Sequence, residues 1–212
     1  LAAFPEITVE GKRALDAGAS TGGFTEVLLR RGAREVVAVD VGHGQLVPQL
    51  RADPRVVVHE GLNIRYLDPA DIGGPAALTV CDLSFISLTL VLAPLAAATE
   101  PAGDLLLLVK PQFEVGRERL SRTGVVTSDA ERRRAVAAVA GSAVALGLRL
   151  RGLAASPLPG QDGNLEYFLH LQRGPASGTE SAGTDMLEAA ADAPDRVRAL
   201  LDAAWPGTAA DH

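Results

Sequence analysis

Residues 13–40 read RALDAGASTGGFTEVLLRRGAREVVAVD, and this stretch decides the fold. The short apolar run Arg13–Asp16 predicts a buried strand, and Phe24–Arg31 has its apolar residues at helical spacing. Glu35–Asp40 predicts a second strand that ends in an acid, and Gly18–Gly23 is a glycine-rich turn before the helix. This order of strand, glycine turn, helix, strand and acid is typical of half of a nucleotide-binding α/β unit.

The turn departs from the two common phosphate-binding patterns. Ser20 stands where the dinucleotide pattern G-x-G-x-x-G has glycine, and Phe24 follows Gly23 where a phosphate loop has Lys-Ser or Lys-Thr. Asp16, just before the turn, would repel a pyrophosphate but suits a cationic amino acid such as methionine with its sulfonium. The stretch therefore favours S-adenosylmethionine, with an ordinary glycine turn of another α/β protein as the alternative.

The predicted cofactor site uses three strand ends. Glycines let the backbone approach a ligand closely, and the free N–H groups of the helix start face it. An acid after the second strand can accept both hydroxyls of a ribose, and the loop after the third strand meets the adenine. The residues predicted to bind the cofactor are Asp16, Gly18, Ser20, Gly22, Gly23, Phe24, Asp40, Asn63 and Asp82.

The rest of the chain alternates predicted strands and helices up to about residue 173. The further strands are expected at Arg55–His59, Ala76–Cys81, Asp104–Val109, Leu148–Ala154 and Leu165–Leu171, and the further helices at His43–Arg51, Ser84–Ala98 and Asp129–Leu146. Turn residues between the last two strands predict a long hairpin. Together these elements predict an α/β, Rossmann-like fold with a seven-stranded, mostly parallel sheet and an antiparallel last strand.

Charge is distributed unevenly along the chain. The net charge is −6, but residues 174–212 hold seven acids and two arginines, so residues 1–173 carry only about −1. We predict a domain over residues 1–173, followed by a flexible linker and an acidic tail with a short helix within residues 186–205. Arg117, Arg119 and Arg122 form a local basic cluster, which we predict contacts RNA from a mobile loop.

Cysteine use and hydropathy limit where the protein acts. Cys81 is the only cysteine, which excludes an internal disulfide and fits a reducing compartment, so we expect a cytoplasmic protein. No apolar run approaches the roughly 20 residues of a membrane span, so no membrane partner is expected. The four histidines lack metal-ligand spacing, so no metal is expected.

Three ionisable residues are predicted to converge beside the cofactor: Asp82, Lys110 and Glu166. Ligands in doubly wound sheets lie at the carboxyl ends of the strands, where these residues fall. Of twenty basic residues only Lys12 and Lys110 are lysine, and lysine, unlike arginine, can give up its proton. A carboxylate–lysine–carboxylate set can hold a hydroxyl and either remove its proton or stabilise the developing alkoxide. Each residue taken singly has a structural explanation as well, so their joint placement carries the hypothesis.

Other methyl acceptors fit less well. Methylation of an adenine amine usually uses Asn/Asp-Pro-Pro-aromatic after the fourth strand, whereas residues 82–85 read DLSF. Methylation of cytosine carbon 5 needs a cysteine nucleophile, but Cys81 on a strand faces away from Asp82 and is better explained as a small buried apolar residue.

Four motifs in order closely resemble the TlyA family: residues 15–25 (LDAGASTGGFT), 82–87 (DLSFIS), 109–114 (VKPQFE) and 163–168 (GNLEYF). The resemblance covers roughly residues 11–171. The family comprises FtsJ-like ribose 2′-O-methyltransferases of ribosomal RNA, historically called haemolysins. It implies the class I methyltransferase fold, S-adenosylmethionine as cofactor, and ribosomal RNA or ribosomal subunits as partners.

The resemblance also implies a lysine–aspartate–lysine–glutamate catalytic set, of which the last three map to Asp82, Lys110 and Glu166. The family's first lysine lies in an upstream segment that has no match here, and Lys12 is not equated with it. The family's N-terminal RNA-binding domain also has no match, so we expect an N-terminally truncated chain. A non-catalytic RNA- or ribosome-binding module with the same fold is the alternative, and a membrane-lytic protein is disfavoured by the absence of a span.

Overall fold

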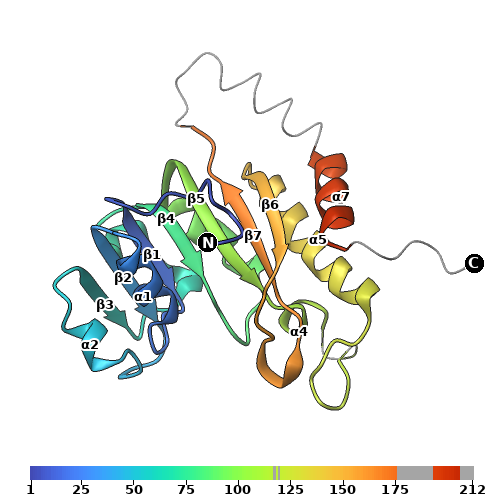
Figure 1. The fold of residues 1–212 in the computed structure, drawn as a ribbon, viewed down its shortest axis with the longest axis horizontal. Coiled ribbons are helices and arrows are strands. Elements are labelled where there is room, and N and C mark those ends of the chain that lie inside the picture. The colour runs from blue at the N-terminus through green and yellow to red at the C-terminus, as the bar shows by residue number, and fades with distance from the viewer. Residues whose placement is uncertain (117, 119, 176–192, 206–212) are drawn as a thin grey trace, which may run out of the picture.

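The computed structural model describes residues 1–116, 118, 120–175 and 193–205. Figure 1 shows one sheet that runs from β3 on one side to β6 on the other, with α5 and α7 lying beyond β6. In chain order the helices and strands are β1 (Arg13–Ala17), α1 (Gly23–Arg30), β2 (Glu35–Asp40), α2 (Pro48–Arg51), β3 (Val56–Glu60), η1 (Ile64–Tyr66), η2 (Pro69–Ile72), β4 (Ala76–Cys81), η3 (Leu88–Leu90), α3 (Leu92–Ala97), β5 (Thr99–Val109), α4 (Pro111–Glu114), α5 (Asp129–Ala145), β6 (Arg149–Ala155), η5 (Gln161–Gly163), β7 (Tyr167–Gln172) and α7 (Ala193–Ala204).

The sheet has seven strands in the order β3-β2-β1-β4-β5-β7-β6. Neighbours from β3 to β5 pair in parallel, and β7 pairs antiparallel with both β5 and β6. The predicted α/β fold with an antiparallel last strand is therefore confirmed. The chain order reverses at β1 and β4, and in doubly wound sheets a ligand binds at such a switch point.

Successive side chains of each strand point to opposite faces of the sheet, and apolar side chains cover both faces. One face packs Ala14, Val36 and Leu106 against α1 and the N-terminal segment. The other face packs Leu15, Val37 and Leu107, with many more side chains, against α3, α5 and α7. Because the strands are buried on both faces, their sequences are almost continuously apolar rather than alternating.

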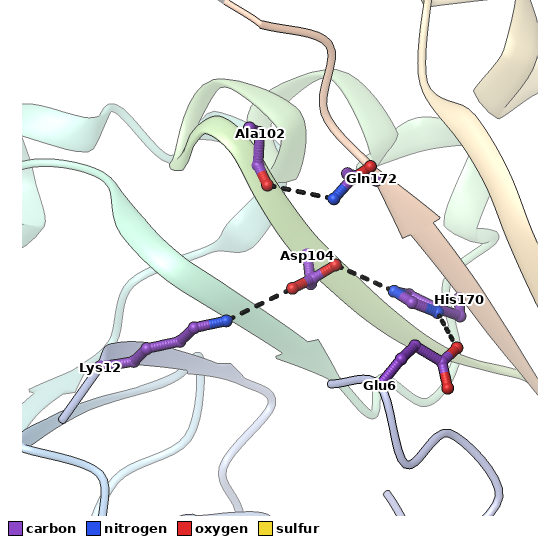
Figure 2. A network of polar contacts seen from close by, with 6 residues as sticks. All are labelled: Glu6, Lys12, Ala102, Asp104, His170 and Gln172. Atoms are coloured by element: carbon purple, nitrogen blue, oxygen red, sulfur yellow. Dashed lines mark hydrogen bonds and ion pairs between the residues drawn. The ribbon is translucent and has the colours of Figure 1, made fainter. Parts of the chain in front are cut away.

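A partly buried polar network anchors the N-terminal segment to the sheet (Figure 2). The His170 ring lies between two carboxylates, with Nε2 3.0 Å from Asp104 Oδ1 and Nδ1 3.1 Å from Glu6 Oε1. Lys12 Nζ pairs with the other Asp104 oxygen at 3.4 Å. Asp104 precedes Lys110 by six residues along an extended strand, about 20 Å. Lys12 therefore lies far from the strand ends, consistent with keeping it out of the catalytic set.

Two predicted helices are shorter than the sequence indicated. In place of a helix over His43–Arg51 the structure has only α2, which begins at Pro48 because proline lacks an N–H and fits the first helical position. In place of a helix over Ser84–Ala98 it has a loop, then η3 and α3. Phe85, with a φ of 65°, cannot continue a right-handed helix. Directly after Lys110 the structure has the short helix α4, for which no prediction was made.

The C-terminal helix α7 packs on the sheet domain. Leu201 is buried, and the Trp205 ring stacks on Tyr167 with centroids 4.4 Å apart and planes 26° apart. The linker predicted over residues 174–184 lies almost entirely outside the described residues. The helix predicted within residues 186–205 is described only from Ala193.

Candidate functional site

The turn after β1 brings the backbone close to the end of β4. Gly18 has a φ of 87°, and a Cβ at this position would clash with the backbone carbonyl oxygen of Asp82. Gly22 has a φ of 106° and would clash with Leu46 and Leu50. Both conformations favour glycine, and together they form a tight turn that leads into α1. Gly23 is the first residue of α1. A Cβ added at Gly23 would have no heavy atom within 4 Å, so the helix start is open on this side.

Asp16 is fully buried beneath this turn. Its Oδ2 accepts a hydrogen bond of 2.6 Å from the Thr25 hydroxyl, while Oδ1 has no hydrogen-bond partner among the described residues. Burial raises the pKa of Asp16 to about 6, because the hydrogen bonds from Thr25 only partly offset the loss of solvation. A buried carboxylate oxygen without a partner fits a cationic donor, such as the ammonium of an amino-acid ligand.

Asp40 ends β2 beside the same turn. Its Oδ2 accepts from the backbone N–H of Ser20 at 2.9 Å, and its Oδ1 accepts from Gly42 at 2.7 Å. A carboxylate offers about four acceptor sites, so each oxygen keeps capacity for a hydroxyl. Leu62 donates its N–H to the Asp40 carbonyl, which brings the Asn63 loop to this strand end. The arrangement fits a ribose diol.

Two predicted cofactor residues have structural contacts. The Asn63 side chain is exposed and caps η1 by accepting from the Arg65 backbone N–H at 3.0 Å. The Phe24 ring packs into the apolar cluster under α1 and meets Phe168 edge-to-face at 6.2 Å. Only the backbone of Phe24 is therefore directed toward a ligand at the helix start, and cofactor contact by either residue stays a prediction.

Lys110 and Asp82 meet at the ends of β5 and β4. Lys110 Nζ lies 2.6 Å from Asp82 Oδ1 and donates to Ser84 Oγ at 3.1 Å. The lysine side chain is 14% exposed and that of Asp82 34%. The ion pair therefore sits at the rim of the site, within reach of a ligand and partly shielded from water.

Glu166 completes the cluster from the residue before β7. It is 7% exposed, and burial raises its pKa, although the nearby Lys110 charge and a hydrogen bond from Gln112 oppose the shift. The Asp82 charge adds to the rise. The structure thus pairs Lys110 with Asp82 and places Glu166 close enough for both charges to act on it, as their positions at strand ends predict.

Two residues with no role in the sequence interpretation hold this cluster. Gln112 donates to Glu166 at 3.2 Å. Glu114 accepts from the Ser87 hydroxyl at 2.5 Å and from the Leu88 backbone at 2.8 Å, which ties α4 to the loop after β4. The sequence signal that they share is alternation, with polar residues at the second and fourth positions after Lys110.

A cavity of about 430 Å³ opens beside these residues. Phe85 is 84% exposed and its ring lies 5.1 Å from that of Phe113. The volume falls in the usual range for small-molecule sites, about 300–1,000 Å³. The lining residues are Phe85, Ile86, Ser87, Gln112, Phe113, Gly116, Leu120, Gly124, Asp162 and Asn164.

The predicted basic cluster is only partly described. Arg117 and Arg119 lie outside the described residues, and Arg122 is exposed. The other arginine cluster of the sequence, residues 132–134, is paired along α5 and α7 with Asp129, Asp202 and Glu131. These neutralised side chains make a poor phosphate-binding surface.

Other chemistries find no support in the described residues. Cys81 is buried, and burial raises the pKa of its thiol far above the usual value, which opposes a role as nucleophile. Within the described ranges no cluster of His, Cys, Asp and Glu is arranged to hold a metal. Nor does any described helix have the length and apolarity to cross a membrane.

Relatives match along most of this chain. A protein of Mycobacterium tuberculosis, "16S/23S rRNA (cytidine-2'-O)-methyltransferase TlyA", is 57% identical over 166 residues, which are 78% of this chain and 62% of the relative. "Putative rRNA methyltransferase YqxC" of Bacillus subtilis is 45% identical over 170 residues, 79% of this chain and 60% of the relative. The chain thus spans about three fifths of the length of these curated relatives.

Solved structures share the fold. A putative haemolysin from Streptococcus thermophilus superposes with a TM-score of 0.79 at 40% identity, covering 94% of this chain and 72% of the other. A structure described as a "putative S-adenosylmethionine dependent methyltransferase" from Listeria monocytogenes superposes with a TM-score of 0.59 at 16% identity, covering 79% of this chain and 93% of the other, which shows the fold alone. The sequence profile of the FtsJ-like methyltransferase family matches residues 1–173, and the chain belongs to this family.

Proposed function

We propose that this protein methylates the 2′-hydroxyl of a ribose in ribosomal RNA, with S-adenosylmethionine as methyl donor. The contact between Lys110 Nζ and Asp82 Oδ1 beside the glycine turn is the observation that carries the proposal. Relatives named as rRNA (cytidine-2'-O)-methyltransferases support the substrate class.

The cofactor would lie over the turn at the ends of β1 and β2. Asp16 Oδ1 would accept from the ammonium of its methionine part, and Asp40 would accept from its ribose hydroxyls. When bound, S-adenosylmethionine supplies a methyl carbon on positive sulfur, which an oxygen in line with the carbon–sulfur bond can displace. Holding the two reacting atoms in line provides much of the rate enhancement.

Lys110 would act on the ribose hydroxyl. The ion pair with Asp82 is made by the ammonium form of lysine, so we infer that Lys110 stabilises the alkoxide that develops as the hydroxyl passes its proton to water at the partly exposed rim and its oxygen takes the methyl group. Asp82 and Glu166 hold the ammonium at the rim of the site, and each must be ionised to do so. Of the two roles that the sequence allows for Lys110, we therefore propose stabilisation of the alkoxide and not removal of the proton.

The 430 Å³ cavity would hold the acceptor nucleotide. The exposed Phe85 and its neighbour Phe113 offer ring faces on which an unpaired base can stack. Since the cavity shares Gln112 with the Glu166 contact, a base bound there places its ribose near Lys110. Arg122 would contact phosphate, together with Arg117 and Arg119 outside the described residues.

The test is methyl transfer from labelled cofactor to separated ribosomal subunits. The chain, a version extended at its N-terminus, and Lys110→Met in both are compared, and the product is identified as a 2′-O-methyl nucleoside. We expect Lys110→Met to abolish transfer while calorimetry shows cofactor affinity within a few-fold of the parent. Undiminished transfer by Lys110→Met refutes the proposed role. Absence of cofactor binding in both parent proteins would favour a non-catalytic RNA-binding module instead.

A further inference from the structure

Gln112 lies between the catalytic cluster and the acceptor cavity. It is the second residue of α4, two positions after Lys110, and is 8% exposed. Its Nε2 donates to Glu166 Oε1 at 3.2 Å. The oxygen of the same side-chain amide, Oε1, is buried without a hydrogen-bond partner among the described residues. An unpaired buried carbonyl lowers stability, so an apolar side chain of the same size would serve the fold as well.

The carboxylate that Gln112 contacts is closely enclosed. Glu166 follows the β6–β7 loop, and a Cβ on Gly160 would clash with its Oε1 and carboxyl carbon. The Glu166 carbonyl accepts from Ser156 N–H at 2.8 Å, which fixes its backbone. The charged groups that act on the carboxylate are Lys110 and Asp82, with opposite effects. Gln112 supplies the hydrogen-bond donor.

We propose that Gln112 is a positioning residue of the methyl-transfer site: it fixes the Glu166 carboxylate in its ionised form, facing Lys110. The assignment rests on the function proposed above. A donated hydrogen bond stabilises the ionised carboxylate and restricts its rotation, and the Gly160 backbone packs closely against the same carboxyl group. Glu166 without this donor is a buried acid with a higher pKa, which protonates more readily and then no longer supplies a negative charge beside Lys110.

The proposal predicts a loss of activity that depends on pH. Gln112→Met keeps the volume and removes the donor, so Glu166 protonates at higher pH. Methyl transfer should fall on the acid side of the pH profile, by at most about tenfold, the largest effect expected for losing one hydrogen bond to a charged group, and should approach the parent rate as the pH rises. Gln112→Glu places a second carboxylate against Glu166, and its loss at pH 6 should be larger still. Gln172→Met is the matched control, because Gln172 donates to the Ala102 carbonyl at the opposite edge (Figure 2).

A second measurement reads Glu166 without catalysis. Carbon NMR titration of the labelled carboxyl in the full chain should show Glu166 titrating at higher pH in Gln112→Met than in the parent and the control. An unmoved titration overturns the assignment, whatever the activity. An equal loss of transfer at every pH, accompanied by a lower melting temperature, also overturns it by showing a purely structural role. Parent protein inactive toward every RNA, but with the expected titration shift, would refute the proposed function and leave the Gln112–Glu166 coupling standing.

Discussion

Replacing Asp16 with asparagine separates the requirements of folding from those of cofactor binding. Asp16 is fully buried, accepts one hydrogen bond from Thr25 at 2.6 Å and keeps Oδ1 unpaired. Burial raises its pKa from 3.8 to about 6, and the charges of Asp82 and Asp40 add to the rise. Asparagine has the same shape and no charge, so Asp16→Asn removes the buried charge without leaving a cavity.

The sign of the stability effect follows from that shift. Because the folded-state pKa lies above the unfolded value, folding favours the protonated acid, and stability falls as the pH rises from about 4 to about 6. Two units of pKa correspond to about 3 kcal/mol. We therefore expect Asp16→Asn to raise the free energy of unfolding of the ligand-free protein at pH 8 by about 1–3 kcal/mol, and by little at pH 4.

Cofactor binding should change in the opposite direction. A cationic ligand needs the ionised acid, so parent affinity should rise about tenfold between pH 5 and pH 7 as Asp16 ionises. Asp16→Asn should bind about 10- to 100-fold more weakly at pH 8, the usual effect of losing a hydrogen bond to a charged group, and should lose most of the pH dependence. Urea unfolding and calorimetry at each pH make both measurements. Asp53→Asn, in the surface turn before β3, is the control.

Lower stability of Asp16→Asn at pH 8 together with unchanged affinity would refute this reasoning. That result would mean that the acid serves the fold through Thr25 and that its free oxygen faces no ligand. Higher stability with unchanged affinity would retain the electrostatic argument and refute only the assignment of the ammonium site.

Three further predictions concern the stability of the fold. Gly18→Ala should destabilise the ligand-free protein by about 2 kcal/mol or more in urea unfolding, because a left-handed φ and a backbone clash coincide, whereas Gly23→Ala in the open first turn of α1 should be neutral or stabilising. Trp205→Ala should cost about 1–3 kcal/mol by the same measurement through loss of its stack on Tyr167, and no change would show that α7 does not dock in solution. His170→Leu should cost about 1–3 kcal/mol, since Asp104 and the half-exposed Glu6 each lose a hydrogen-bond partner, and wild-type stability would show that the network is dispensable.

The parts of the fold predicted from the sequence are those specified by local patterns. Gly18, Gly22 and the valine-rich strand after α1 are each recognisable within a few residues, so β1, α1 and β2 were placed almost to the residue. The antiparallel last strand followed from the turn-rich hairpin before it. Parallel pairing of the other strands followed from the helices between them, whereas their order in the sheet, β3-β2-β1-β4-β5-β7-β6, was not predicted.

The errors arise where distant contacts override local preference. Residues 84–98 are rich in leucine and alanine and favour one helix, but Glu114 from α4 takes the Ser87 hydroxyl and the Leu88 N–H. These bonds hold the preceding loop open and place Phe85 at the cavity. Gln112 escaped notice for the same reason, since its partner lies 54 residues away in the sequence. Positions at strand ends predict which acids converge, but not which side chains support them.

The edge of the sheet where these acids converge is electrostatically unfavourable without a cation. Burial is the largest cause of the raised pKa of Asp16 and of Glu166; the Asp82 and Asp40 charges add to the rise at Asp16, and the Asp82 charge adds to the rise at Glu166. The Lys110 charge opposes the rise in the pKa of Glu166, whereas the Asp16 side chain beneath the turn accepts from the neutral Thr25 hydroxyl. These buried carboxylates lower the stability of the ligand-free protein. A cationic ligand beside Asp16 and a hydroxyl beside Lys110 would offset that loss when they bind. The methyl donor and the acceptor proposed for this protein meet those two requirements at adjacent points of one strand edge.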